Sequence, residues 1–123
     1  MTAWLCAMGA ILVIAATDAD AGGNAATGAA LFNRCALCHA TTKDGGNRMG
    51  PDLFGVVGRK AGTYPGFAYS TALKASGIVW TPATLDAWLE APQKVVPGNT
   101  MPLAGVSSPS QRADLVAYLA TLK

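Results

Sequence analysis

The sequence has only one histidine, His39, and only three cysteines among its 123 residues. A four-ligand zinc site built from cysteine and histidine needs one more such ligand than remains once Cys6, in the first apolar segment, is set aside. The chain also lacks alternating apolar and polar runs of strand length, internal repeats and nucleic-acid-binding motifs. These absences argue against a zinc module, a sheet domain and a nucleic-acid binder, and they favour an all-α domain.

The chain also lacks an apolar run of about 20 residues, the length that a membrane-spanning helix needs. Residues 5–16 form an apolar run of twelve, and residues 19–21 read Ala-Asp-Ala, as at a leader cleavage site. We therefore predict a signal peptide at residues 1–21 and one domain at residues 22–123. A membrane anchor that is retained is the alternative, because residues 1–4 contain no lysine or arginine. An Arg-rich transit peptide is absent, which favours the bacterial periplasm over a mitochondrion.

Residues 35–39 read Cys-Ala-Leu-Cys-His, which is the C-x-x-C-H pattern for covalent attachment of a c-type haem. One helical turn places both sulfurs where they can form thioethers with the two vinyl groups of a porphyrin. The next side chain then directs an imidazole nitrogen at the iron. A thioredoxin-like dithiol is the alternative, but such a pair normally follows a strand, whereas residues 28–34 read as helix. We expect one haem c, bound through Cys35 and Cys38, with His39 as an iron ligand.

The second axial position on the iron needs a different kind of ligand, because the chain has no second histidine. A thioether, a lysine, a terminal amine or water are the candidates. Met49 follows His39 by ten residues in a glycine-rich loop without rigidity, so we interpret it as a packing residue. Met101 lies in a loop stiffened by two prolines and far enough along the chain to return on the opposite face. We therefore predict Met101 as the second ligand.

Three main helices are expected from start signals and apolar stripes. The first begins after Asn24 and runs to about Leu37, the second begins at Thr81-Pro82 and stops before Pro92, and the third begins after Ser108. A short helix is expected near residues 70–75, and long loops cover residues 41–65 and 97–105. Gly28 falls inside the first helix, where we expect the last helix to approach closely.

Beyond residues 35–39, the chain resembles class I cytochromes c, of the bacterial cytochrome c2 and mitochondrial cytochrome c group. The likeness covers nearly all of residues 24–122 and rests on GPDLFGVVGRKAG, PGFAYS, GIVW, LEAPQKVVPGNTMPLAG and RADLVAYL, in the family's order. It implies the class I fold, with three main helices and long loops around one covalent haem.

The resemblance also implies roles for individual residues. The carbonyl of Gly50-Pro51 should accept a hydrogen bond from the non-ligating nitrogen of His39. Arg59, Tyr69 and Trp80 occupy positions that bind the haem propionates in this family. The matching positions of the helices imply that Gly28 and Phe32 pack against Leu115 and Tyr118. Trp88 departs from the family, because it stands where a tyrosine usually hydrogen-bonds near the methionine sulfur.

The function implied is one-electron transfer without catalysis, since a filled sixth position leaves a substrate nowhere to bind. Transient partners with acidic surfaces, in the membrane or the periplasm, are expected for a monomer that binds no nucleic acid. Basic side chains remain near the haem edge at Arg34, Lys43, Arg48 and Lys94, fewer than in relatives, so steering should be weak and salt-dependent. Two alternatives stay open: a membrane-tethered electron-transfer subunit, and a haem peroxidase or gas-binding cytochrome with a labile sixth ligand.

Overall fold

A computed structural model of the chain describes residues 22–123. In chain order its helices are α1 (Ala25–Leu31), the 3₁₀ helix η1 (Phe32–Arg34), α2 (Thr71–Ala75), α3 (Pro82–Glu90), α4 (Pro92–Val95) and α5 (Pro109–Leu119). Among these residues, β pairing is limited to one isolated bridge between Lys60 and Val79. The prediction of an all-α architecture with three main helices and long loops is confirmed, the three being α1, α3 and α5. The predicted signal peptide, residues 1–21, lies outside the described residues.

Each main helix begins where the sequence predicts, because a polar side chain caps its first turn. Asn24 accepts a hydrogen bond from the backbone N–H three residues later, and Thr81 and Ser108 do the same for α3 and α5. Such caps satisfy backbone donors that have no partner within the helix. Within residues 22–123, no helix combines the length and apolar character that a bilayer crossing would require.

The first helix is shorter than predicted. It ends at Leu31 and continues as η1, after which the backbone N–H groups of Cys38 and His39 both donate to the carbonyl of Cys35, at 3.0 and 2.9 Å. The chain therefore keeps turning through the C-x-x-C-H segment, with a mixture of 3₁₀ (i→i−3) and α-helical (i→i−4) hydrogen bonds. A second difference is α4, a single turn after Pro92 that the sequence analysis did not predict.

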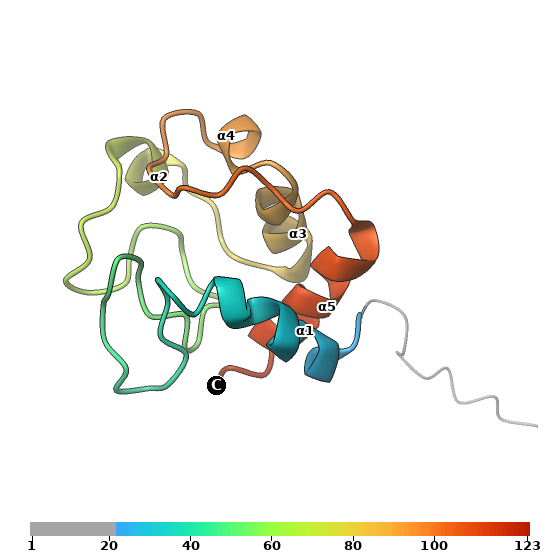
Figure 1. Cartoon of the computed structure of the whole chain (residues 1–123). Coiled ribbons are helices and arrows are strands. Elements are labelled where there is room, and N and C mark those ends of the chain that lie inside the picture. The colour runs from blue at the N-terminus through green and yellow to red at the C-terminus, as the bar shows by residue number, and fades with distance from the viewer. Residues whose placement is uncertain (1–21) are drawn as a thin grey trace, which may run out of the picture.

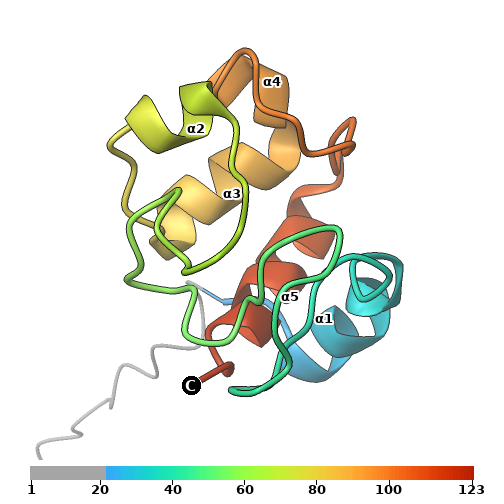
Figure 2. The same ribbon diagram turned by 90° about the vertical axis from the view of Figure 1, so that its left-hand side faces the viewer.

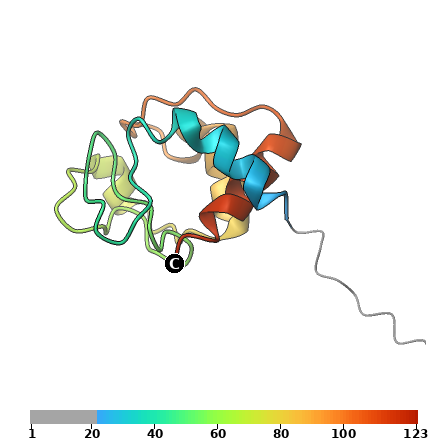
Figure 3. The same cartoon turned by 60° about the horizontal axis from the view of Figure 1, so that its bottom comes forward.

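The α1–α5 pair forms one side of the domain, and Figures 1 and 3 both show α1 crossing α5. The expected close approach occurs at Gly28, where a Cβ would collide with the backbone carbonyl of Asp114 on α5. One turn later the rings of Phe32 and Tyr118 pack with their centroids 5.2 Å apart. Tyr118, one of the two expected packing partners on the last helix, therefore lies against both Gly28 and Phe32.

Helix α3 packs against both α5 and α4, and Figure 2 shows α2, α3 and α4 stacked above α1 and α5. The buried Arg112 of α5 joins the two layers, because its Nε lies 2.9 Å from a carboxylate oxygen of Asp86 on α3. Its Nη1 also donates to the carbonyls of Val106 and Ser107, at 2.9 and 3.0 Å. The long loop between η1 and α2, green in Figures 1 and 3, arches away from the α1–α5 pair.

Candidate haem-binding site

A cavity of about 380 Å³ lies between the helices and the long loops. Its volume falls in the range of about 300–1,000 Å³ that is usual for small-molecule and cofactor sites. Most of its lining is apolar, with Phe32, Leu85, Trp88 and Leu115 among the core side chains that contribute. A haem is a flat, mostly apolar ring system, so the character of this lining suits it.

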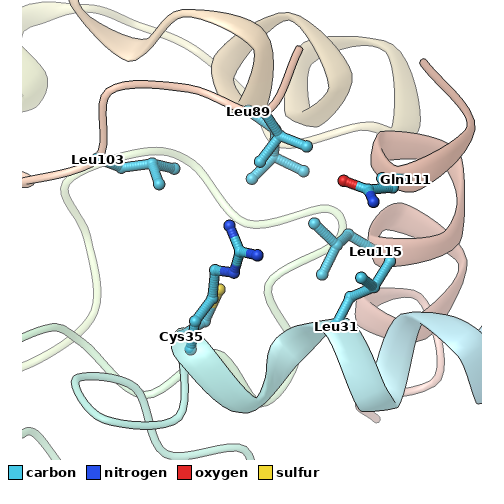
Figure 4. Close-up of a pocket in the computed structure, with 8 residues that line it drawn as sticks. Leu31, Cys35, Leu89, Leu103, Gln111 and Leu115 are labelled. Atoms are coloured by element: carbon cyan, nitrogen blue, oxygen red, sulfur yellow. The ribbon is translucent and has the colours of Figure 1, made fainter. Parts of the chain in front are cut away.

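A second hollow of only about 10 Å³ lies where α1, α3 and α5 meet. Figure 4 shows Leu31 of α1, Leu89 of α3 and Leu115 of α5 converging on it. Leu89, Leu115 and Cys35 line the large cavity as well, so the hollow adjoins that cavity. Its size is that of about one water molecule, and its apolar walls offer water few hydrogen bonds.

Cys35, Cys38 and His39 line one side of the cavity. Both cysteines are half-buried free thiols, and the turn that contains them brings Cys35, Cys38 and the imidazole to the same wall. Burial raises the pKa of the Cys35 thiol, partly offset by the positive charge of Arg34. The Cys35 thiol is therefore held as a neutral group beside the cavity.

The imidazole of His39 is held in one orientation. It is 7% exposed, and its Nδ1 lies 2.7 Å from the carbonyl oxygen of Pro51. A carbonyl can only accept a hydrogen bond, so Nδ1 carries the proton and Nε2 keeps its lone pair. Burial lowers the pKa of His39, and the hydrogen bond to Pro51 opposes that shift only in part. The ring therefore stays neutral, as a metal ligand must be.

Met101 reaches the same cavity from the other end of the chain. Its loop is held by Asn99, a buried residue whose side-chain Nδ2 donates to the carbonyl of Val96 at 2.9 Å. The Oδ1 of Asn99 accepts the backbone N–H of Met101 at 3.1 Å. The loop thus ties Met101 to the end of α4, while its thioether is available to the cavity.

Three hydrogen-bond donors also line this cavity: Arg59, Tyr69 and Trp80. The guanidinium of Arg59 donates to the carbonyls of Asp52 and Phe54, at 2.9 and 2.5 Å, which fixes it while leaving other N–H groups free. The hydroxyl of Tyr69 accepts a backbone N–H at 3.1 Å, so its own proton remains to be donated. Trp80 also lines the cavity, and its indole N–H can donate a hydrogen bond but cannot accept one.

Comparison with known proteins identifies the family. The family model for cytochrome c matches residues 25–123. The chain belongs to the cytochrome c family.

Several relatives of this cytochrome c chain cover most of its length. It is 51% identical to cytochrome c2 of Rhodopila globiformis over 102 residues, which cover 82% of this chain and 95% of that protein. It is 54% identical to cytochrome c of Trypanosoma brucei brucei over 84 residues, which cover 68% of this chain and 90% of that protein. The solved structure of cytochrome cH from Methylobacterium extorquens superposes with a TM-score of 0.76 at 46% identity, covering 80% and 99% of the two chains.

As a cytochrome c, the chain carries one haem c, bound covalently through Cys35 and Cys38. It is an electron carrier and not an enzyme, and it exchanges electrons with redox partners in transient encounters. The residues that line the cavity also fit a haem, independently of the comparisons. The cavity is apolar where the ring system would lie, two thiols and a neutral imidazole share one wall, and Arg59, Tyr69 and Trp80 line it with hydrogen-bond donors.

The structure brings all of the sequence-predicted site residues to one cavity, but it contradicts the interpretation of Met49. That side chain is 79% exposed at the mouth of the cavity and is not a packing residue. The reason is its loop, which turns outward between the exposed Arg48 and the buried Gly50. Trp88 lines the cavity too, with its ring 5.3 Å from that of Trp80 in an edge-on arrangement.

Two supporting residues escaped the sequence analysis. Gly50 lies flat against the imidazole of His39, where any Cβ would collide with the ring. Asp52 is fully buried, and its carboxylate accepts the backbone N–H groups of Gly46 and Phe54 at 3.1 and 2.9 Å. It thereby folds the loop that presents Pro51 to His39. The sequence carries no signal for Asp52 beyond an acid directly after Pro51 in a glycine-rich loop, because its burial is seen only in the structure.

Proposed function

We propose that this cytochrome c is a secreted one-electron carrier whose iron is ligated axially by His39 and Met101. The observation that carries the proposal is the shared cavity: two candidate ligands more than sixty positions apart in the sequence line the same space. His39 would bind through its Nε2 lone pair, because Nδ1 is occupied by Pro51. Met101 would supply a neutral sulfur from a loop already tied to α4.

The bound haem would supply a one-electron Fe(III)/Fe(II) couple, whose potential is raised by His/Met ligation in cytochromes c. Residues of this chain would hold both ligands in place in either oxidation state, because each is anchored by hydrogen bonds within the protein. The apolar lining would exclude water from the iron. A filled sixth position would leave no site for a substrate, which is what an electron carrier requires.

Arg59, Tyr69 and Trp80 would bind the haem propionates. A carboxylate taken out of water needs charged or strongly polar donors, and these three residues present unused N–H or O–H groups to the cavity. Burial raises the pKa of Tyr69, so its hydroxyl keeps the proton it would donate at neutral pH. Their common role would be to offset the free-energy cost of removing the propionates from water.

We propose that partners dock at the mouth of the cavity with acidic surfaces. Met49, which lines the cavity, is 79% exposed, and Leu37 is 78% exposed. The basic side chains of Arg34 and Arg48 are exposed as well, and Arg48 donates to the carbonyl of Ala36, the residue before Leu37. An apolar centre with a sparse basic rim suits short-lived contacts of less than about 1,200 Å². Few charges mean that the association rate should fall only modestly with salt.

Residues 1–21 are proposed to be a cleaved signal peptide that directs residues 22–123 to the periplasm. The apolar run and the Ala-Asp-Ala segment support this, and the missing basic residues at the start favour the membrane-tethered alternative. Cell fractionation followed by sequencing of the mature N-terminus separates the two. A periplasmic protein that starts near Gly22 supports cleavage, and a membrane-bound protein that starts at Met1 or Thr2 contradicts it.

Absorption spectroscopy on the ferric holoprotein tests the ligand assignment. Sulfur on ferric haem iron gives a weak long-wavelength band, which should be present in the wild type and absent in Met101→Ala. The matched control is Met49→Ala, which removes the other methionine near the cavity and should keep the band. A high-spin wild-type spectrum, or loss of the band in Met49→Ala alone, would show that Met101 is not the ligand.

A further inference from the structure

The side chain of Gln93 clamps the loop that carries Met101. Gln93 is the second residue of α4, and its Nε2 donates to the backbone carbonyl of Asn99 at 2.7 Å. The Oε1 of the same carboxamide accepts the backbone N–H of Gly98 at 3.1 Å. One exposed side chain thus bonds both a donor and an acceptor of the loop backbone.

The Gln93 bonds add to those that Asn99 makes within the loop. Pro97 has no N–H to donate and Gly98 has a φ of +90°, so the helical hydrogen bonds of α4 cannot continue into this loop. The clamp connects to Met101 through Asn99, whose backbone carbonyl accepts from Gln93 and whose side chain accepts the N–H of Met101. A continuous path of hydrogen bonds therefore runs from Gln93 to the backbone of the proposed ligand.

We infer that Gln93 is a positioning residue that holds Met101 at the haem iron and so determines how easily another ligand displaces it. This inference depends on the proposed ligation by Met101. An uncharged thioether is a weak ligand, and moving it away requires the loop to open. Opening breaks both bonds to Gln93, so the clamp adds directly to the cost of displacement.

Replacement by alanine should expose this contribution without unfolding the protein, because Gln93 lies at the surface. Two partly exposed side-chain hydrogen bonds, each at the low end of their usual net contribution, correspond to about a fivefold change in an equilibrium constant. Gln93→Glu should have a smaller effect, since a carboxylate can still accept the N–H of Gly98 but cannot donate to Asn99.

The test is titration of the ferric holoprotein with imidazole, followed by loss of the long-wavelength band. Gln93→Ala should bind imidazole about fivefold more tightly than the wild type, with Gln93→Glu between the two. The control is Asn33→Ala, which removes a carboxamide at another exposed position; its affinity should match the wild type. Circular dichroism establishes that each variant is folded.

Two outcomes overturn the inference: wild-type imidazole affinity in folded Gln93→Ala, or an equal gain in Asn33→Ala. Either one leaves the proposed function intact as long as Met101→Ala lacks the band. If Met101→Ala keeps the band, the ligand assignment itself fails, and the inference about Gln93 fails with it. The two failures are therefore distinguished by one additional spectrum.

Discussion

Replacing Gly50 by alanine should destabilise the protein through His39 alone. A Cβ at this position would lie 2.7 Å from Nδ1 and 2.9 Å from Nε2 of the imidazole. Real Cβ atoms essentially never come closer than 3.0 Å to another heavy atom. The backbone of Gly50 does not have a positive φ, so alanine meets no conformational penalty. The only relief is a shift of the ring, which would strain its hydrogen bond to Pro51.

The expected loss follows from those two effects. Overpacking of a buried site costs about 1–3 kcal/mol, and a weakened hydrogen bond costs about 0.5–1.5 kcal/mol. Gly50→Ala should therefore lower the free energy of unfolding of the holoprotein by about 1.5–4.5 kcal/mol, which for a domain of this size is a drop in Tm of roughly 6–36 °C. Thermal unfolding followed by circular dichroism measures it.

A matched control is Gly22→Ala, because nothing lies within 4 Å of a Cβ at that position. It should change the free energy of unfolding by less than about 0.5 kcal/mol. The reasoning is refuted if Gly50→Ala unfolds at the same temperature as the control. A loss of stability with no change in the haem absorption spectrum would place the strain somewhere other than at His39.

Three further predictions concern packing, burial and pH. Gly28→Ala should weaken the α1–α5 contact by about 1–3 kcal/mol in urea unfolding, since its Cβ would strike the carbonyl of Asp114; an unchanged midpoint would contradict that contact. Asp52→Ala should cost about 1–3 kcal/mol by leaving two backbone N–H groups without their acceptor, and calorimetry would show a wild-type Tm if this is wrong. Burial raises the pKa of Tyr69, so the folded state binds more protons than the unfolded state above about pH 10. Stability should therefore fall as pH rises past that value, and less steeply in Tyr69→Phe; equal slopes would exclude Tyr69 as the cause.

The helix starts could be predicted because each is encoded locally. A cap at Asn24, Thr81 or Ser108 needs only one side chain and the turn that follows it. The end of α1 could not be predicted in the same way. The carbonyl of Phe32 accepts the N–H groups of both Cys35 and Ala36, one as in a 3₁₀ turn and one as in an α-helix. Local sequence does not say which of the two patterns prevails at a helix end.

The candidate site was predictable where chemistry restricts the residue type. Covalent attachment of a porphyrin requires two cysteines and a histidine at fixed spacing, so residues 35–39 could be recognised from the sequence as the attachment site. Gln93 carries no such signal, because an exposed glutamine after a proline is ordinary surface until the loop folds back on it. The interpretation of Met49 as a packing residue was wrong for a related reason: apolar character does not tell whether a loop side chain points into the protein or out of it.

The measurement that tests the central claim most directly is the proton NMR spectrum of the reduced holoprotein. A methionine methyl group held over the porphyrin plane is strongly shielded by the ring current, so its signal lies far from those of other methyl groups. We expect one such signal in the wild type and in Met49→Leu, and none in Met101→Ala. A spectrum without it, or one in which it survives the loss of Met101, would contradict the account.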